Sequence, residues 1–172
     1  MQSRALSFGD DGDVPNNPLP LIIYPAVIDA GGGDPAVAFE RLFRRHGWGG
    51  GWRNGIYPFH HYHSTAHEVL GIAAGSADVR FGGERGETVT VRAGDAVLIP
   101  AGVGHRRLSG SADLLVIGAY PSGQSPDLQR SGAPDGAAIR RSIATVPLPG
   151  QDPLAGAGGP MAAHWGAITP PG

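Results

Sequence analysis

The chain alternates short β-type runs with glycine-containing turns from Trp52 to Tyr120. We expect strands at about 54–63, 68–73, 77–81, 88–92, 96–99, 105–109 and 113–120. The segment GGERGE at 82–87 predicts a hairpin loop, because glycines supply the positive φ angles of tight turns. Many short strands separated by turns indicate an all-β sandwich or barrel. With 172 residues, the chain has the length of a single domain.

The segments that flank these strands have a different composition. We expect an N-terminal arm with a strand near 21–28 over residues 1–33, a helix over 34–47, the barrel core over 52–120, and a C-terminal segment over 121–172 that wraps around the barrel. Asp34 as N-cap, Pro35 at the first helical position and apolar residues at helical spacing predict the helix. AAIRRSIATV at 137–146 is a candidate for a second, shorter helix.

Composition excludes several classes of site. The chain has no cysteine, so disulfides, thiolate metal sites and cysteine nucleophiles are absent, and any metal must bind to nitrogen and oxygen ligands. A net charge of −2 without a basic block argues against nucleic acid as a partner. The beginning of the chain lacks a signal-peptide pattern, and no apolar run reaches the roughly 18 residues of a spanning helix. We therefore expect a cytoplasmic protein that does not enter a membrane.

Histidines gather in PFHHYHSTAHEVL, which holds His61, His63 and Glu68. Side chains alternate between the two faces of a strand, so His61 and His63 point to the same side. A short turn follows, and Glu68 at the start of the next strand can return to that side. Two imidazoles and one carboxylate on one face predict a metal site.

A second segment, GDAVLIPAGVGH, ends in His105. It consists of a turn, a buried strand and a further turn, which can bring His105 back towards the barrel interior. Three histidines and one carboxylate suit Fe, Mn, Ni, Cu or Zn as a divalent ion. The lack of an oxygen-ligand cluster argues against Ca²⁺ and Mg²⁺. These ligand types do not distinguish one transition metal from another.

At these residues the sequence resembles the cupin superfamily. Its first motif is matched by Gly55, His61, His63, Glu68 and Gly75, with four residues between His63 and Glu68. Its second motif is matched by residues Gly94, Pro100, Gly102 and His105. The final position of that motif, Asn in the family, is Ser109 here, but it is not a metal ligand in the family. The resemblance implies a double-stranded antiparallel β-barrel, or jelly roll, with one or two peripheral helices and one metal ion.

The wording HYHSTAHEVLG and IPAGVGHRR is more narrowly similar to the YjlB-type bacterial cupins, a functionally uncharacterised group. The cupin scaffold hosts oxygenases, isomerases, sugar binders and storage proteins, so the fold alone does not give the function. We expect a metal-dependent enzyme of dioxygenase or isomerase type that acts on a small, anionic organic molecule. The alternative is a non-catalytic module that binds or senses a small molecule through the metal.

Other residues are candidates for positions around the metal. His67 could replace Glu68 as a ligand, hold a ligand in place through its ring N–H, or lie at the surface. Tyr57 and Phe59 are an even number of residues from His61, so on a strand they point inward on the same face. They either line the pocket or fill the end of the barrel. Arg106, or Arg107 beside it, could clamp a substrate carboxylate.

Two further expectations concern surfaces. Trp48 and Trp52 flank three glycines, which suggests either a flexible loop with aromatic anchors or a lid over the barrel mouth. The apolar run LPLIIY near the N-terminus would expose an aggregation-prone strand edge, so we expect a homodimer that covers it.

Overall fold

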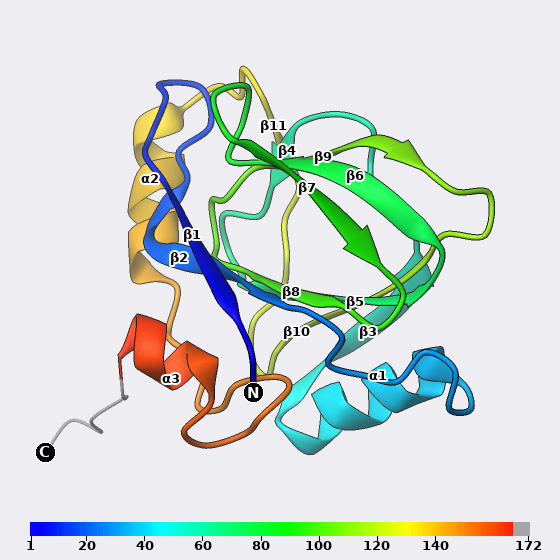
Figure 1. The fold of residues 1–172 in the computed structure, drawn as a ribbon. Helices are drawn as coiled ribbons and strands as arrows, with labels where there is room; N and C mark the ends of the chain where they lie inside the picture. The colour runs from blue at the N-terminus through cyan, green and yellow to red at the C-terminus, as the bar shows by residue number, and fades with distance from the viewer. Residues whose placement is uncertain (167–172) are drawn as a thin grey trace, which may run out of the picture.

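Within residues 1–166, which the computed structural model describes, two antiparallel sheets face one another as a β-barrel (Figure 1). The six-stranded sheet has the order β1 (Arg4–Phe8), β2 (Asn17–Tyr24), β8 (Ala96–Ile99), β5 (Glu68–Ala74), β10 (Leu115–Pro121), β3 (Trp48–Asn54). The five-stranded sheet has the order β11 (Gln129–Arg130), β4 (His61–Tyr62), β9 (His105–Gly110), β6 (Ser76–Phe81), β7 (Glu87–Arg92). The expected all-β architecture is confirmed.

Both faces of the six-stranded sheet are covered, as strand β5 shows. Leu70 and Ile72 of β5 belong to the core between the two sheets. Val69 and Ala73, on the opposite face, belong to a second core beneath the helices. The alternation of side chains along a strand explains why residues 69–73 are apolar without interruption: this strand has no face towards solvent.

Helix α1 (Pro35–Arg45) covers the outer face of that sheet (Figure 1). Its N-cap Asp34 accepts hydrogen bonds from the amides of Ala36 and Val37, at 3.0 and 3.3 Å. Phe39 of the helix packs directly on Gly71 of β5, where an added Cβ would lie 2.5 Å from the phenyl ring. Glycine at 71 thus allows the close approach of helix and sheet.

The N-terminal arm is more ordered than its sequence suggests. Residues 4–8 form β1, which pairs with β2, although this segment lacks the pattern of a strand. The strand expected at 21–28 is β2, and it ends at Tyr24. Pro25 has no N–H to donate to a ladder, and Ala26 has a φ of 48°, so the chain turns here.

The glycines after Trp48 lie in a strand, which corrects the expectation of a loop or a lid. Strand β3 pairs with β10, and Trp52 lies opposite Gly118. The strand expected over 54–63 is reduced to His61 and Tyr62, which form β4. The residues between β3 and β4 lie outside the ladders, and this irregular stretch contributes to the cavity described below.

The C-terminal segment, described up to residue 166, wraps around the barrel and carries two helices. Helix α2 (Gly136–Thr145) packs Ile139 and Ile143 against Tyr62. Helix α3 (Pro160–Trp165), which the sequence does not predict, makes three helices within the described part, against the one or two expected. The last six positions of the predicted wrapping segment lie outside the described residues.

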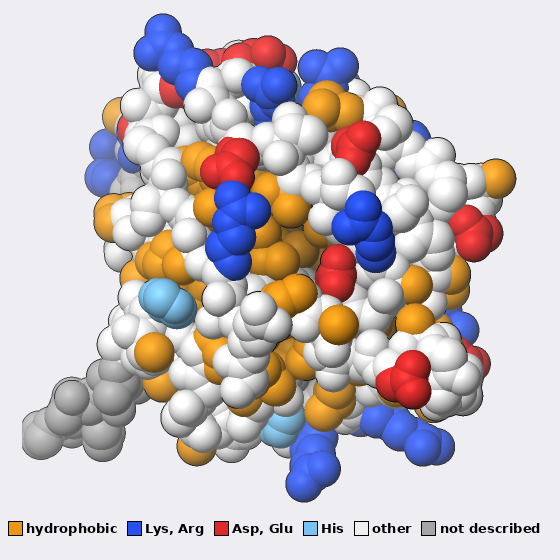
Figure 2. Space-filling view, in the orientation of Figure 1, with side chains coloured by type: hydrophobic (Ala, Val, Ile, Leu, Met, Phe, Trp, Pro, Cys, Tyr) orange, Lys and Arg blue, Asp and Glu red, His pale blue; other side chains and the backbone are white. Residues whose placement is uncertain are grey.

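The edges of the two sheets meet where Arg4 of β1 forms an ion pair with Glu87 of β7. Figure 2 shows hydrophobic side chains in a hollow between charged groups on this face. The LPLIIY run lies in β2, whose Leu21–Tyr24 part is buried between β1 and β8. This run therefore no longer supports a homodimer, which stays a prediction. None of the helices in residues 1–166 has the length and apolar character needed to cross a membrane.

Candidate metal centre

The predicted ligands come from three strands and one connecting segment of the barrel. His61 lies in β4 directly opposite His105 of β9. Glu68 is the first residue of β5 in the facing sheet. His63 lies just beyond β4. The site therefore joins the two sheets at one end of the barrel interior.

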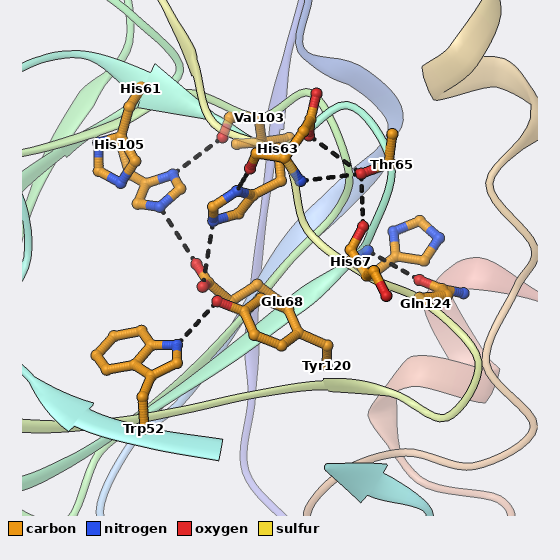
Figure 3. A network of polar contacts seen from close by, with 12 residues as sticks. Trp52, His61, His63, Thr65, His67, Glu68, Val103, His105, Tyr120 and Gln124 are labelled. Carbon is orange, nitrogen blue, oxygen red and sulfur yellow. Dashed lines mark hydrogen bonds and ion pairs between the residues drawn. The ribbon is translucent and has the colours of Figure 1, made fainter. Parts of the chain in front are cut away.

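Three of the four side chains converge on a common point (Figure 3). The Nε2 atoms of His63 and His105 each lie 3.3 Å from a carboxylate oxygen of Glu68. One ligand atom from each of the three residues lies within 4.8 Å of the others. Ligand atoms that share one transition-metal ion at about 2.1 Å are about 3.0 to 3.4 Å apart. The two separations of 3.3 Å therefore fit a shared ion.

Backbone carbonyls orient all three imidazoles. The Nδ1 of His61 donates to the carbonyl of Phe59 at 3.0 Å, and the Nδ1 of His105 donates to that of Val103 at 3.1 Å. The Nδ1 of His63 donates to the carbonyl of Asp127. A carbonyl oxygen only accepts, so the proton of each neutral ring is on Nδ1, and Nε2 carries the lone pair that a metal ion needs.

His61 lies beside this group rather than within it. Its ring centroid is 4.0 Å from that of His105, but 6.2 Å from that of His63. Its nitrogens are not among the ligand atoms that converge within 4.8 Å. The rings of Tyr57 and Phe59 pack at steep angles to its ring, with centroids 5.1 and 5.7 Å away.

The electrostatics of the group favour a cation. Burial opposes the charged form of Glu68, yet His63 and His105 hold the pKa of its carboxyl far below the usual range. Burial also disfavours a charged His63, but Glu68 raises its pKa to about 9. Burial and the neighbouring His105 lower the pKa of His61 to about 3, so its ring is neutral. The buried carboxylate is thus stabilised by positive charge, which a proton or a metal ion can supply.

Tyr120 and Trp52 join the site without having been predicted as site residues. The Nε1 of Trp52 donates to the Tyr120 hydroxyl at 2.8 Å. Burial and the Glu68 carboxylate raise the pKa of Tyr120, so its phenol stays protonated. Both residues belong to the barrel wall, and no motif in the sequence distinguishes them from core aromatics.

A cavity of about 620 Å³ opens over the ligands. Its lining includes His61, His63, Glu68 and His105, together with apolar side chains such as Leu70, Leu114 and Leu128. This volume lies in the range of small-molecule sites. Tyr57 lines the cavity and stacks on Phe59, with ring centroids 4.8 Å apart. Phe59 is not among the residues that line this cavity, and the Arg130 guanidinium lies over its ring.

Arg106 does not face this cavity. Its Nε donates to the carbonyl of Pro58, and its Nη1 lies 3.6 Å from Glu84 at the surface. Side chains alternate along β9, so Arg107, like His105, points inward, and Arg107 lines the cavity. Of the two arginines considered for substrate binding, Arg107 and not Arg106 lines the cavity.

His67 is directed away from Glu68 (Figure 3). Its Nδ1 accepts a hydrogen bond from the amide of Ala101 at 2.9 Å, and its ring centroid is 5.0 Å from that of Trp165. Burial lowers the pKa of His67 to about 4, so the ring is neutral. The alternation of side chains at the start of β5 turns His67 outward and Glu68 inward. The expected roles of His67 as a ligand or beside one find no geometric support.

Comparisons with known proteins identify the family of the chain. A family model described as a cupin domain matches residues 53–117. The uncharacterized protein YjlB of Bacillus subtilis (strain 168) is 39% identical over 165 residues, which cover 95% of this chain and 97% of that protein.

Solved structures with a similar fold are more distant in sequence. Acireductone dioxygenase from Bacillus anthracis, described with a cadmium ion in its active centre, is 17% identical, with a TM-score of 0.39 over 54% of this chain. Procruciferin, an 11S globulin from Brassica napus, is 18% identical, with a TM-score of 0.38 over 46% of this chain. The chain spans 63% of the first protein and 21% of the second, less than two thirds of either.

Proposed function

The chain is a YjlB-like member of the cupin family, and we propose that it is a metal-dependent enzyme of dioxygenase or isomerase type that acts on a small organic substrate. The metal is one divalent Fe, Mn, Zn, Ni or Cu ion. Its ligands are the side chains of His63, Glu68 and His105, with His61 as a weaker fourth ligand.

One observation carries this proposal. The Nε2 atoms of His63 and His105 both face the buried Glu68 carboxylate, 3.3 Å away, while their Nδ1 protons are donated to backbone carbonyls. A proton on His63 or a metal ion can supply the positive charge that this carboxylate needs, and a metal ion can bind both Nε2 atoms and the carboxylate at once. A structural role for these residues would not require three rings to be fixed in the same tautomer.

The protein supplies the surroundings that chemistry at such an ion requires. A bound divalent transition metal provides Lewis acidity or, if redox-active, access to oxygen chemistry. Glu68 offsets part of the ionic charge. The Tyr120 hydroxyl accepts from Trp52 and is held beside Glu68, so its own proton can stabilise that carboxylate. The apolar walls of the cavity lower the local dielectric constant and strengthen these interactions.

Elemental analysis of protein purified without added metal tests the first step. We expect close to one equivalent of a transition metal, and activity screens with small organic acids, with and without oxygen, would then identify the reaction class. Protein that takes up none of the five metals contradicts the proposal.

Water relaxation with Mn²⁺ bound separates the enzyme from a binding or sensing module. Exchangeable water on the ion indicates an open coordination position, as catalysis requires. A coordinatively closed ion favours the binding role instead.

A further inference from the structure

Arg107 is the one Lys or Arg side chain that lines the cavity within the described part of the chain. It follows His105 by two residues on β9, so both side chains project to the same face of the strand. Two residues of a strand span about 7 Å. A fixed positive charge therefore lies on the cavity wall, one step along the strand from a predicted metal ligand.

The backbone holds this guanidinium but leaves its outer end available. The Nε of Arg107 donates to the carbonyl of Ile56, and the Arg107 amide donates to that of Tyr57, both at 3.0 Å. Within residues 1–166, neither Nη1 nor Nη2 has a hydrogen-bond or ion-pair partner in the protein. A planar pair of N–H donors in a fixed orientation matches the two oxygens of a carboxylate. By contrast, Arg106 already lies beside Glu84.

The charges around the cavity limit what can bind. Its carboxylates within the described residues are Glu68 and Asp127. Asp127 is occupied by hydrogen bonds from Ser64 and Gln129. With a divalent ion at the predicted ligands, the ion and Arg107 exceed the two carboxylates by one positive charge. This surplus of one positive charge suits a monoanion rather than a phosphate dianion. The leucines of the lining suit a ligand whose remaining part is apolar.

From this placement we propose that Arg107 binds the carboxylate of a monoanionic substrate. The apolar body of the substrate lies against Leu70, Leu114 and Leu128, and its other end reaches the predicted ligands. The inference rests on the proposed metal-dependent function for the role of that other end. It makes Arg107 the binding residue that selects acids over their neutral analogues.

A matched pair of probes tests the preference for a carboxylate. We would titrate 3-phenylpropanoate and 3-phenylpropanamide into the metal-free and the Zn²⁺-loaded protein and follow binding by NMR. A hydrogen bond to a charged group adds about tenfold or more in affinity, so the acid is expected to bind at least that much more tightly than the amide in both forms. Equal affinities for acid and amide would overturn the proposal without any variant.

Neighbouring arginines on β9 provide the matched variants. Arg107→Met is expected to abolish the preference for the acid, and Arg106→Met to retain it. If both variants lose the preference equally, the effect is one of general charge and the assignment to Arg107 is wrong. Arg107→Lys keeps the charge, so a partly retained preference in that variant supports the proposal even where Arg107→Met does not fold.

Zn²⁺ binding to the same proteins separates this inference from the proposed function. The Arg107 guanidinium is charged whether or not metal is bound, so the preference for the acid is expected in both forms. Loss of Zn²⁺ binding with the acid preference intact contradicts the metal-dependent function alone. Intact Zn²⁺ binding with equal acid and amide affinities contradicts the role of Arg107 alone.

Discussion

Two of the three predicted histidine ligands are oriented by their own local sequence. His61 donates to the carbonyl of Phe59 and His105 to that of Val103, in each case two residues earlier in the chain. His63 instead depends on Asp127, which is 64 residues later. The tautomers of His61 and His105 are thus set when their strands form. That of His63 is set only when the C-terminal segment packs against the barrel.

Alanine substitutions at the site should have unequal effects on metal binding. His63→Ala, Glu68→Ala and His105→Ala are each expected to lower Zn²⁺ affinity by about 100-fold or more, since even partners of ligands contribute about 10- to 100-fold. His61→Ala should cost about tenfold, because its nitrogens lie outside the converging group. Competition titration with a chromophoric chelator measures these affinities.

His60→Ala is the control for this series, since its ring lies on the other side of the strand and contacts Glu84 at 2.6 Å. It should bind Zn²⁺ like the unaltered protein. If His61→Ala loses as much affinity as His63→Ala, then His61 is a full ligand and moves into the group when metal binds.

At the scale of elements, the sequence predicts those parts of the fold whose signals are local. Helix α1 has its N-cap and proline, and its apolar spacing matches the face that packs on the sheet. Strand β1 carries no such signal, because its edge position requires only pairing with β2. The glycines of β3 suggest a loop, and only the long-range pairing with β10 makes them a strand.

The candidate site, like the fold, has residues that the local sequence predicts and residues that only the tertiary structure brings in. The spacing of the two motifs identifies the four predicted ligands, because alternation along a strand decides which side chains point inward. The cavity residues Tyr120 and Asp127 come from segments that reach the site only through the tertiary fold. Which of Arg106 and Arg107 faces the cavity depends on the alternation of side chains along β9. Counting from His105, which points inward, this alternation already places Arg107 on the inner face.

Helix α2 is tied to the N-terminal segment by an ion pair that makes stability depend on pH. Hydrogen bonds from Arg140 lower the pKa of Asp10 from 3.8 to about 2. Because the pKa is lower in the folded state, the stabilisation is present above pH 3.8 and is lost as the pH falls towards 2. The pair is exposed to solvent, so Arg140→Met should lower the free energy of unfolding at pH 7 by less than about 1 kcal/mol.

Urea unfolding at a series of pH values tests this expectation. The difference between Arg140→Met and the unaltered protein should shrink below pH 3.8 and approach zero near pH 2. Arg141→Met, a change at an exposed neighbouring position, should show no such pH dependence. A difference for Arg140→Met that stays constant down to pH 2 would mean that the side chain stabilises by packing and not by its charge.

At the scale of the whole molecule, the two ends of the chain complete one core beneath the six-stranded sheet. Trp165 of α3 packs with Tyr24 of β2 in this core, and its Nε1 donates to the carbonyl of Pro20 at 2.8 Å. Trp48 is held in a similar way by the carbonyl of Gln151, at 3.0 Å. The C-terminal segment therefore belongs to the folded unit, and its removal would expose the outer face of the sheet.

Asp152 is the polar centre of this arrangement and is fully buried. Its carboxylate accepts the Tyr24 hydroxyl at 2.7 Å and the amides of Leu154, Ala155 and Met161 at 2.8 to 3.0 Å. Asp152→Asn keeps the shape but directs an amide N–H₂ at these donors. It should lower the free energy of unfolding by about 1–3 kcal/mol, the cost of buried groups without partners.

Tyr24→Phe is the matched comparison, because it removes one of the four donors and leaves the carboxylate with the other three. It should cost about 1 kcal/mol, the usual net contribution of a single hydrogen bond. Urea unfolding measures both variants, and limited proteolysis should cut Asp152→Asn first in the C-terminal segment. If the Asp152→Asn variant is as stable as the unaltered protein, the C-terminal segment is held by its apolar contacts alone. The buried carboxylate would then contribute nothing to the stability of the outer core.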